Sequence, residues 1–278
     1  MQARFIAIPE TAIYRTMTAI VRTFTARGFV IVADGRTTGD DRKTIITDST
    51  QKIFEAASIG GSFALSTCGA SEVDIPGGGS INLVSEFLKS AELLRRERIG
   101  DLRAYAVKLS EPVMEGLAQQ GGSRFELEGS EVTGTDYEPG ATVIRVFLDG
   151  YLNQRPASVT IRLFHESGKL QEPEIREPQL YPGHQTIYGS DVVARLLFVD
   201  EDPRFSRYRG RRIFAPEMTV MDAVERSIAY ISACSDPVAL ELDEFCRTIG
   251  GHVHIATVKL DEGFQWLPGF SSISEALA

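Results

Sequence analysis

Residues 18–34 read TAIVRTFTARGFVIVAD. Two runs rich in β-branched and aromatic residues flank Ala26-Arg27-Gly28, where glycine is free to adopt the positive φ of a tight turn. This pattern predicts a β-hairpin. A second hairpin is predicted from residues 51–56 and 62–68, which flank Gly60-Gly61. Four short strands are therefore expected before the first helix.

The remainder of the chain alternates groups of helices with groups of strands. Apolar residues at helical spacing predict helices over 80–98, 102–120, 191–199 and 217–233, with Ser80 as a cap for the first. Alternating β-rich runs predict strands over 141–152, 157–165, 184–188, 252–259 and 263–267. This order fits a βαβ doubly wound sheet poorly. It predicts an α+β fold, a four-layer αββα sandwich of two antiparallel sheets between two helix layers.

Several segments carry no strong regular pattern. Residues 123–140 are polar and acidic, and residues 166–183 contain glycines and prolines among charges, so both are expected to be irregular. Asp149-Gly150 is expected to form a turn rather than to supply a catalytic carboxylate. The arginines between residues 204 and 212 predict a solvated loop.

Composition excludes several classes of function. The 278 residues carry a formal net charge of -9, which argues against nucleic-acid binding because phosphates require a surplus of Lys and Arg. No apolar run approaches the length of a membrane span, and the N-terminal residues lack a signal-peptide pattern. Three cysteines favour a reducing compartment, so a cytoplasmic protein is expected.

No cofactor or metal is expected from the motifs. Gly77-Gly78-Gly79 lacks the lysine and hydroxyl residue of a phosphate-binding loop, and it follows no clear strand. His252 and His254 share one face of a predicted strand, but no carboxylate or cysteine stands at a telling spacing from them. Ordinary strand histidines are therefore the preferred interpretation.

Five residues of the first 70 form an ordered set. Thr18 begins the first strand, Asp34 stands 16 positions later in Ala33-Asp34-Gly35-Arg36, and Thr38 stands 20 positions later. Lys52 opens the third predicted strand, and Gly69 ends the fourth. Taken singly, these residues fit an ordinary strand threonine, turn aspartate or strand-edge lysine equally well. Their joint order resembles the opening of proteasome β-type subunits and of the peptidase subunit of the HslUV complex, which are N-terminal nucleophile (Ntn) hydrolases of the αββα fold.

The resemblance implies a role for each matched residue. Thr18 would be the nucleophile, because a threonine hydroxyl needs an adjacent base and its own free α-amino group, with a pKa of about 7.7–8.0, can serve. Lys52 would lower the pKa of that amine by charge repulsion, and Asp34 would orient Lys52. The N–H of Gly69 would stabilise the oxyanion, and the backbone of Thr38 would bind substrate.

Further matches lie in the C-terminal half. Tyr188-Gly189-Ser190-Asp191 resembles the segment before the third helix of the family, so the resemblance implies that Ser190 assists the nucleophile. The family's Asp-x-x-Ser-Gly segment is replaced by Cys246-Arg247-Thr248-Ile249-Gly250. Asp243 lies near this segment but out of register.

The chemistry requires Thr18 to be the first residue of the mature chain. Met17 precedes it, so either residues 1–17 are a propeptide or translation starts at Met17 and methionine removal exposes Thr18. A third alternative is that residues 1–17 stay attached. The domain is expected to span 18–270.

The sequence thus predicts an N-terminal threonine amidohydrolase, a proteasome-like peptidase that acts on a peptide or small amide substrate. The alternative is a non-catalytic proteasome-like assembly or binding subunit with an unprocessed N-terminus. By resemblance, either would form a homo-oligomer, possibly a ring.

Overall fold

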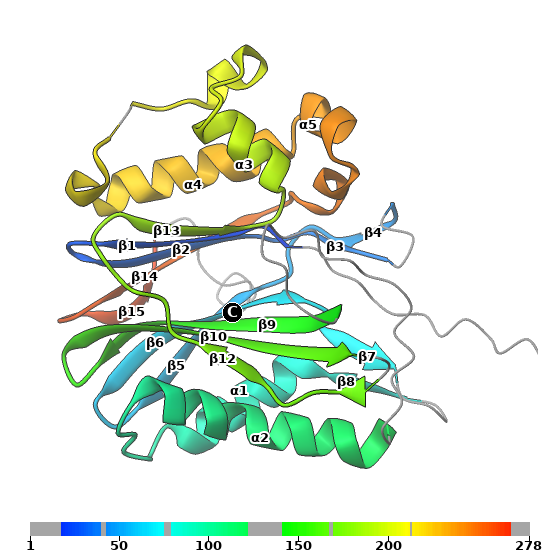
Figure 1. Ribbon diagram of the computed structural model, residues 1–278, viewed down its shortest axis with the longest axis vertical. Helices are drawn as coiled ribbons and strands as arrows, with labels where there is room; N and C mark the ends of the chain where they lie inside the picture. The colour runs from blue at the N-terminus through cyan, green and yellow to red at the C-terminus, as the bar shows by residue number, and fades with distance from the viewer. Residues whose placement is uncertain are drawn as a thin grey trace, which may run out of the picture.

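The structure is a computed structural model, and it describes residues 18–39, 43–74, 79–121, 141–166, 169–211 and 213–267. Two antiparallel sheets face one another (Figure 1). The first has the order β13 (His184–Tyr188), β1 (Ile20–Thr25), β2 (Gly28–Asp34), β14 (Val253–Lys259) and β15 (Gly263–Trp266). The second has the order β11 (Lys169–Leu170), β10 (Arg155–Glu166), β9 (Ala141–Leu152), β6 (Gly61–Gly69) and β5 (Ile53–Ser58), with β12 (Glu174–Arg176) also paired to β10.

Helices cover the outer face of each sheet. Figure 1 shows α3 (Asp191–Phe198), α4 (Val220–Cys234) and α5 (Pro237–Leu242) beyond the first sheet, and α1 (Leu83–Leu94) and α2 (Leu102–Gly121) beyond the second. Among the described residues, no helix combines the length and apolar character needed to cross a membrane. The predicted α+β class with antiparallel sheets is confirmed. The finer assignment of these layers to the αββα sandwich of Ntn hydrolases is a proposal.

Shorter elements connect these layers. Two small sheets pair β3 (Thr37–Thr38) with β4 (Ile45–Thr47) and β7 (Glu72–Asp74) with β8 (Ser80–Asn82). The short 3-10 helices are η1 (Pro203–Tyr208), η2 (Ala215–Glu217) and η3 (Glu244–Thr248). The arginine-rich segment is therefore partly ordered: Arg204 pairs with Asp202, and Arg207 pairs with the buried Asp236.

Helix starts follow local capping rules, with one departure from expectation. Thr219 and Asp222 form a reciprocal capping box at the start of α4. Asn82, not Ser80, caps α1, because Ser80 lies within β8 and the Asn82 side chain accepts from the backbone N–H of Ser85. The expected excursion at 123–140 and the segment 1–17 lie outside the described residues.

Period-two alternation in the strands divides the apolar side chains between separate cores. In β1, Val21 packs under α3 and α4, whereas Ile20 packs between the two sheets. In β6, Leu65 packs under α1 and α2, whereas Ala64 faces the first sheet. Every residue of β2 is buried, because helices cover one face and the second sheet covers the other.

A buried ion pair joins the two sheets. Arg22 of β1 donates to both carboxylate oxygens of Asp149 of β9, from Nε at 2.6 Å and Nη2 at 2.7 Å. Ser158 of β10 completes the network, and Arg22 also lies 4.3 Å from the centroid of the Phe147 ring. The turn expected at Asp149-Gly150 is therefore wrong. β9 runs through both residues because Asp149 is needed inside the sandwich to neutralise Arg22.

Replacing Asp149 by alanine should destabilise the fold by about 3–5 kcal/mol, because the Arg22 guanidinium would remain buried without a counter-charge. The double variant Arg22→Met with Asp149→Leu should recover most of that loss, since it removes both charges. Urea denaturation of each variant measures the free energy of unfolding.

The matched control is Glu86→Ala, which removes an exposed ion pair with Lys89 and should cost under about 0.5 kcal/mol. An Asp149→Ala variant no less stable than this control would contradict the assignment of Arg22–Asp149 as the structural link between the sheets.

Candidate active site

The carboxylate of Asp34 is the centre of the candidate site. Its side chain is 0% exposed, and it accepts four hydrogen bonds. Oδ1 accepts from the backbone N–H of Ala19 and from Lys52 Nζ, each at 2.9 Å. Oδ2 accepts from the backbone N–H groups of Gly250 at 3.0 Å and Arg36 at 3.2 Å. One side chain at the end of β2 therefore fixes three backbone segments and a lysine.

Lys52 lies just before β5 and is 4% exposed. Its ammonium also donates to the carbonyl oxygen of Arg36 at 2.7 Å. Burial pushes the pKa of Asp34 up and the pKa of Lys52 down, and their mutual attraction opposes both shifts. Each charge thus depends on the other, and the predicted pairing of Asp34 with Lys52 is present.

Thr18 lies at the start of β1 beside this pair. It is 5% exposed, and the next residue, Ala19, exchanges backbone contacts with Asp34: the Asp34 N–H donates to the Ala19 carbonyl at 3.1 Å, and the Ala19 N–H donates to the Asp34 carboxylate. Strand alternation puts residue 18 on the same face as Ile20, toward the second sheet.

Strand pairing brings Ser190 to the same place. β1 and β13 are antiparallel with Ile20 opposite Tyr188, so the same register continued by two residues sets Ser190 opposite Thr18. A Cβ added to Gly189 would lie 3.4 Å from the Cα of Ala19, which confirms the close approach of this turn to the first strand. Ser190 is also the N-cap of α3, where its Oγ accepts from the Val193 N–H at 3.1 Å.

Asp243 is a site residue that the sequence analysis set aside as out of register. Ser190 Oγ donates to its Oδ2 at 2.6 Å, and its Oδ1 accepts from the Phe245 N–H at 3.0 Å. The connection between α5 and η3 supplies this carboxylate from a different sequence position. The sequence did carry a signal for this residue. Asp243 stands one residue before a short helix, where an aspartate side chain accepts a hydrogen bond from a backbone N–H of the first turn.

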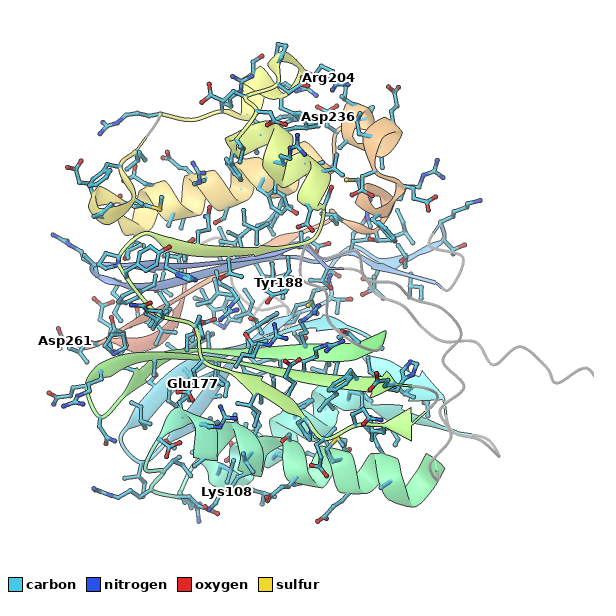
Figure 2. All side chains as sticks on the ribbon, in the orientation of Figure 1. Lys108, Glu177, Tyr188, Arg204, Asp236 and Asp261 are labelled. Carbon is cyan, nitrogen blue, oxygen red and sulfur yellow. The ribbon has the colours of Figure 1, made fainter. Side chains whose placement is uncertain are left out.

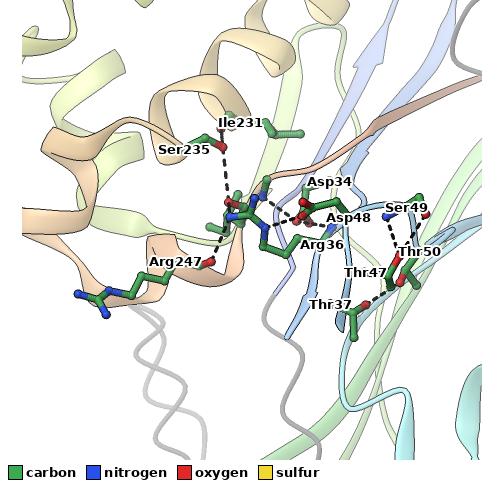
Figure 3. Close-up of polar contacts among 12 residues, drawn as sticks. Asp34, Arg36, Thr37, Thr47, Asp48, Ser49, Thr50, Ile231, Ser235 and Arg247 are labelled. Atoms are coloured by element: carbon green, nitrogen blue, oxygen red, sulfur yellow. Dashed lines mark hydrogen bonds and ion pairs between the residues drawn. The ribbon is translucent and has the colours of Figure 1, made fainter. Parts of the chain in front are cut away.

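Arg36 is a second residue whose role the sequence analysis missed. Its Nε donates to Asp48 at 2.7 Å, and its Nη1 donates to the carbonyls of Arg247 and Ile249, both at 3.3 Å (Figure 3). These contacts hold the segment before β14, which supplies the Gly250 N–H to Asp34. Gly250 has φ of 145°, and a Cβ there would lie 3.0 Å from the Arg36 guanidinium carbon.

Gly69 and Thr38 lie in neighbouring elements. Gly69 ends β6 with φ of 107°, and a Cβ there would lie 2.6 Å from the Val143 carbonyl, so only glycine fits. The Thr67 N–H donates to the Lys52 carbonyl at 3.1 Å, which keeps this end of β6 beside Lys52. Thr38 is buried in β3, and its hydroxyl has no hydrogen-bond partner among the described residues.

His254 is a buried histidine close to this site. It lies on the face of β14 that is directed toward the second sheet, and in the part of the chain that the structure describes neither ring nitrogen has a hydrogen-bond partner. Burial, with contributions from His252 and Lys52, lowers the pKa of His254 to about 4. Its ring centroid lies 4.8 Å from that of His252. No cluster of three or more potential metal ligands occurs in the described ranges.

Comparison with known proteins gives a fold. No protein-family model matches the chain, and no curated protein matches it by sequence. Solved structures match along most of both chains. One is the Anbu (Gly-1) mutant from Hyphomicrobium sp. strain MC1, with a TM-score of 0.50, 13% identity and coverage of 94% of this chain and 91% of that one. Another is Anbu (ancestral beta-subunit) from Yersinia bercovieri, with a TM-score of 0.50, 12% identity and coverage of 91% of this chain and 88% of that one. The chain shares the fold of these Anbu structures.

The comparison corrects one expectation. The resemblance to proteasome β-type and HslV-like subunits was wrong as a family assignment, because the two structures named above are Anbu proteins and no family model matches the chain. The matched motifs were short and lay at strand ends. At such positions an aspartate, a glycine and a lysine stabilise the local backbone geometry. The β3–β4 hairpin lies between Asp34 and Lys52, and the carboxylate that accepts from Ser190 comes from Asp243.

Replacing Asp34 by asparagine should destabilise the protein by about 3–5 kcal/mol at pH 7, because Lys52 would remain as an unpaired buried cation. The folded-state pKa of Lys52 would then fall further below its unfolded value of about 10.4. The unfolded state would bind more protons, so the free energy of unfolding of this variant should rise with pH between about 7 and 10.

Asp48→Asn is the control, since it removes a half-exposed ion pair with Arg36 and should cost no more than about 1 kcal/mol with little dependence on pH. Denaturant unfolding at several pH values compares the two. Equal losses and equal slopes would refute the buried pair.

His254 should make the fold sensitive to acid. Because its folded-state pKa of about 4 lies below the unfolded value of 6.5, the unfolded state binds the proton first as pH falls, and stability is lost between these values. The loss should reach about 3 kcal/mol. His254→Leu should remove this part of the pH dependence, whereas His252→Gln, at an exposed position, should retain most of it. An unchanged acid profile in the leucine variant would count against a neutral buried imidazole.

Proposed function

We propose that this chain is an N-terminal threonine amidohydrolase that cleaves peptide bonds. One observation carries the proposal: a single carboxylate oxygen, Asp34 Oδ1, accepts from both Lys52 Nζ and the Ala19 N–H. A buried ammonium is thereby held beside the backbone of the residue that follows Thr18. Such an arrangement favours the neutral form of an α-amino group at residue 18, because a nearby positive charge lowers the pKa of an amine.

The chemistry follows from that neutral amine. As Thr18 Oγ attacks the substrate carbonyl carbon, the α-amino group takes the hydroxyl proton. The tetrahedral intermediate then collapses, the C–N bond breaks, and the proton passes to the leaving amine. An ester on Thr18 remains, and water hydrolyses it with the same amine as base. Lys52 and Asp34 tune the amine without touching the scissile bond.

Other residues receive supporting roles in the proposal. The N–H of Gly69 would stabilise the oxyanion, a contribution of roughly 3–4 kcal/mol for one donor in studied enzymes. Thr38 would bind the substrate through its backbone. Ser190, held by Asp243 and opposite residue 18 in the strand register, would accept from the amine and orient it.

The proposal extends to processing and assembly. The hydrolase domain would span 18–270 in the four-layer αββα arrangement, with Thr18 exposed either by removal of residues 1–17 or by translation from Met17. One structural neighbour is named an ancestral beta-subunit, which supports a subunit that assembles, so we propose a homo-oligomer.

A peptide α′,β′-epoxyketone tests the nucleophile directly, because its two electrophilic carbons require a hydroxyl and an amine on one residue. A chain that begins at Thr18 should form a covalent adduct located on Thr18 by mass spectrometry, and it should hydrolyse a fluorogenic peptide. The full chain with residues 1–17 attached should form none. Lys52→Met should slow labelling by about tenfold or more, since the amine would stay protonated.

The matched controls are Thr18→Ala, which should not react, and Thr25→Ala at the far end of β1, which should react normally. Failure of the Thr18-terminated, folded chain to form the adduct would overturn the hydrolase. It would favour the alternative, a non-catalytic assembly or binding subunit.

A further inference from the structure

A cavity of about 640 Å³ lies on the helix layer outside the first sheet, away from Thr18. α3, α4 and the segment that includes η1 enclose it, and in Figure 1 this segment is the yellow chain beside α3 and α4. Its size is within the range of small-molecule sites. The apolar part of its wall comes from Leu197, Phe198, Ile213, Ile228 and Ala229.

Arg226 is the cation that sets the chemistry of this cavity. Its guanidinium stacks 3.9 Å from the centroid of the Phe198 ring, and its Nε donates to Gln185 at 3.1 Å. Burial lowers its pKa. No carboxylate in the described part of the chain lies within ion-pair distance of it, in contrast to Arg204 and Arg207, which have Asp202 and Asp236. Apart from the Nε–H, its five N–H donors have no acceptor among the described residues.

Most of the other charged groups of the wall already have a partner within the protein. Arg207 pairs with Asp236, and Asp222 caps α4 through Thr219. Arg209 has Glu201 at 3.9 Å, although its buried Nε has no partner. Arg211 and Glu225 are exposed. Four arginines and three acidic residues line the cavity. Arg207 has its counter-charge in Asp236 outside the wall, so Arg226 is the half-buried arginine left without an acidic partner among the described residues.

We propose that this cavity binds an amphiphilic monocarboxylate, with its carboxylate on the Arg226 guanidinium and its apolar body against Phe198, Ile213 and Ile228. A guanidinium fork matches the two oxygens of a carboxylate. A single carboxylate would neutralise the charge of Arg226, whereas a phosphate dianion would be repelled by Glu201 and Glu225. The apolar wall supplies the remaining affinity by removing hydrocarbon from water.

Isothermal titration of the full chain with decanoate, below its micelle concentration, tests the proposal. Decanoate should bind saturably with one site per chain, and 1-decanol, which lacks the charge, should bind at least about tenfold more weakly. Arg226→Gln should weaken decanoate by a similar factor and leave decanol unchanged. Arg204→Gln, on the same segment but outside the cavity, should bind decanoate normally.

A second variant tests the cavity even if Arg226→Gln fails to fold. Ala229→Leu adds bulk to the cavity wall without touching a charge, and it should weaken decanoate and decanol together. Thermal unfolding confirms that each variant is folded. The proposal is overturned if decanoate shows no saturable binding, if folded Arg226→Gln binds it normally, or if decanol binds as tightly.

Discussion

The carboxylate of Asp34 has no exposed surface, and its burial is compensated by four hydrogen-bond donors. A buried carboxylate without such donors would cost several kcal/mol, so the segments that supply them are constrained to meet. These segments are the start of β1, the turn after β2, the approach to β5 and the turn before β14. The candidate site is therefore assembled by the same contacts that close this end of the sheets.

A second polar connection keeps the two sheets in a fixed relation. Arg22 and Asp149 join β1 to β9 in the middle of the sandwich, and the Arg145 guanidinium lies 5.5 Å from the centroid of the Tyr188 ring. Tyr188 points into the space between the sheets (Figure 2). Lys52 is held by the second sheet and Thr18 by the first. The alignment of the two sheets therefore determines whether the Lys52 ammonium lies beside residue 18.

Local features were predictable from the sequence, and long-range ones were not. The turn before Gly28 and the strand over 141–152 followed from residue patterns, and the pairing of Asp34 with Lys52 was implied by the resemblance. The contact of Ser190 with Asp243 did not, because the assumed spacing set Asp243 aside. The sequence placed Arg36 in a turn and His254 on a strand, but it did not predict their roles, because these depend on contacts between segments about 200 or more residues apart. The family assignment failed because strand-end motifs describe local geometry that different proteins share.

The central claim is that the hydroxyl and a free amine of Thr18 act together. Intact mass spectrometry and N-terminal sequencing of purified protein that is active toward amide bonds test it most directly. The account predicts that the active species begins at Thr18. Active protein that still carries residues 1–17 would contradict it.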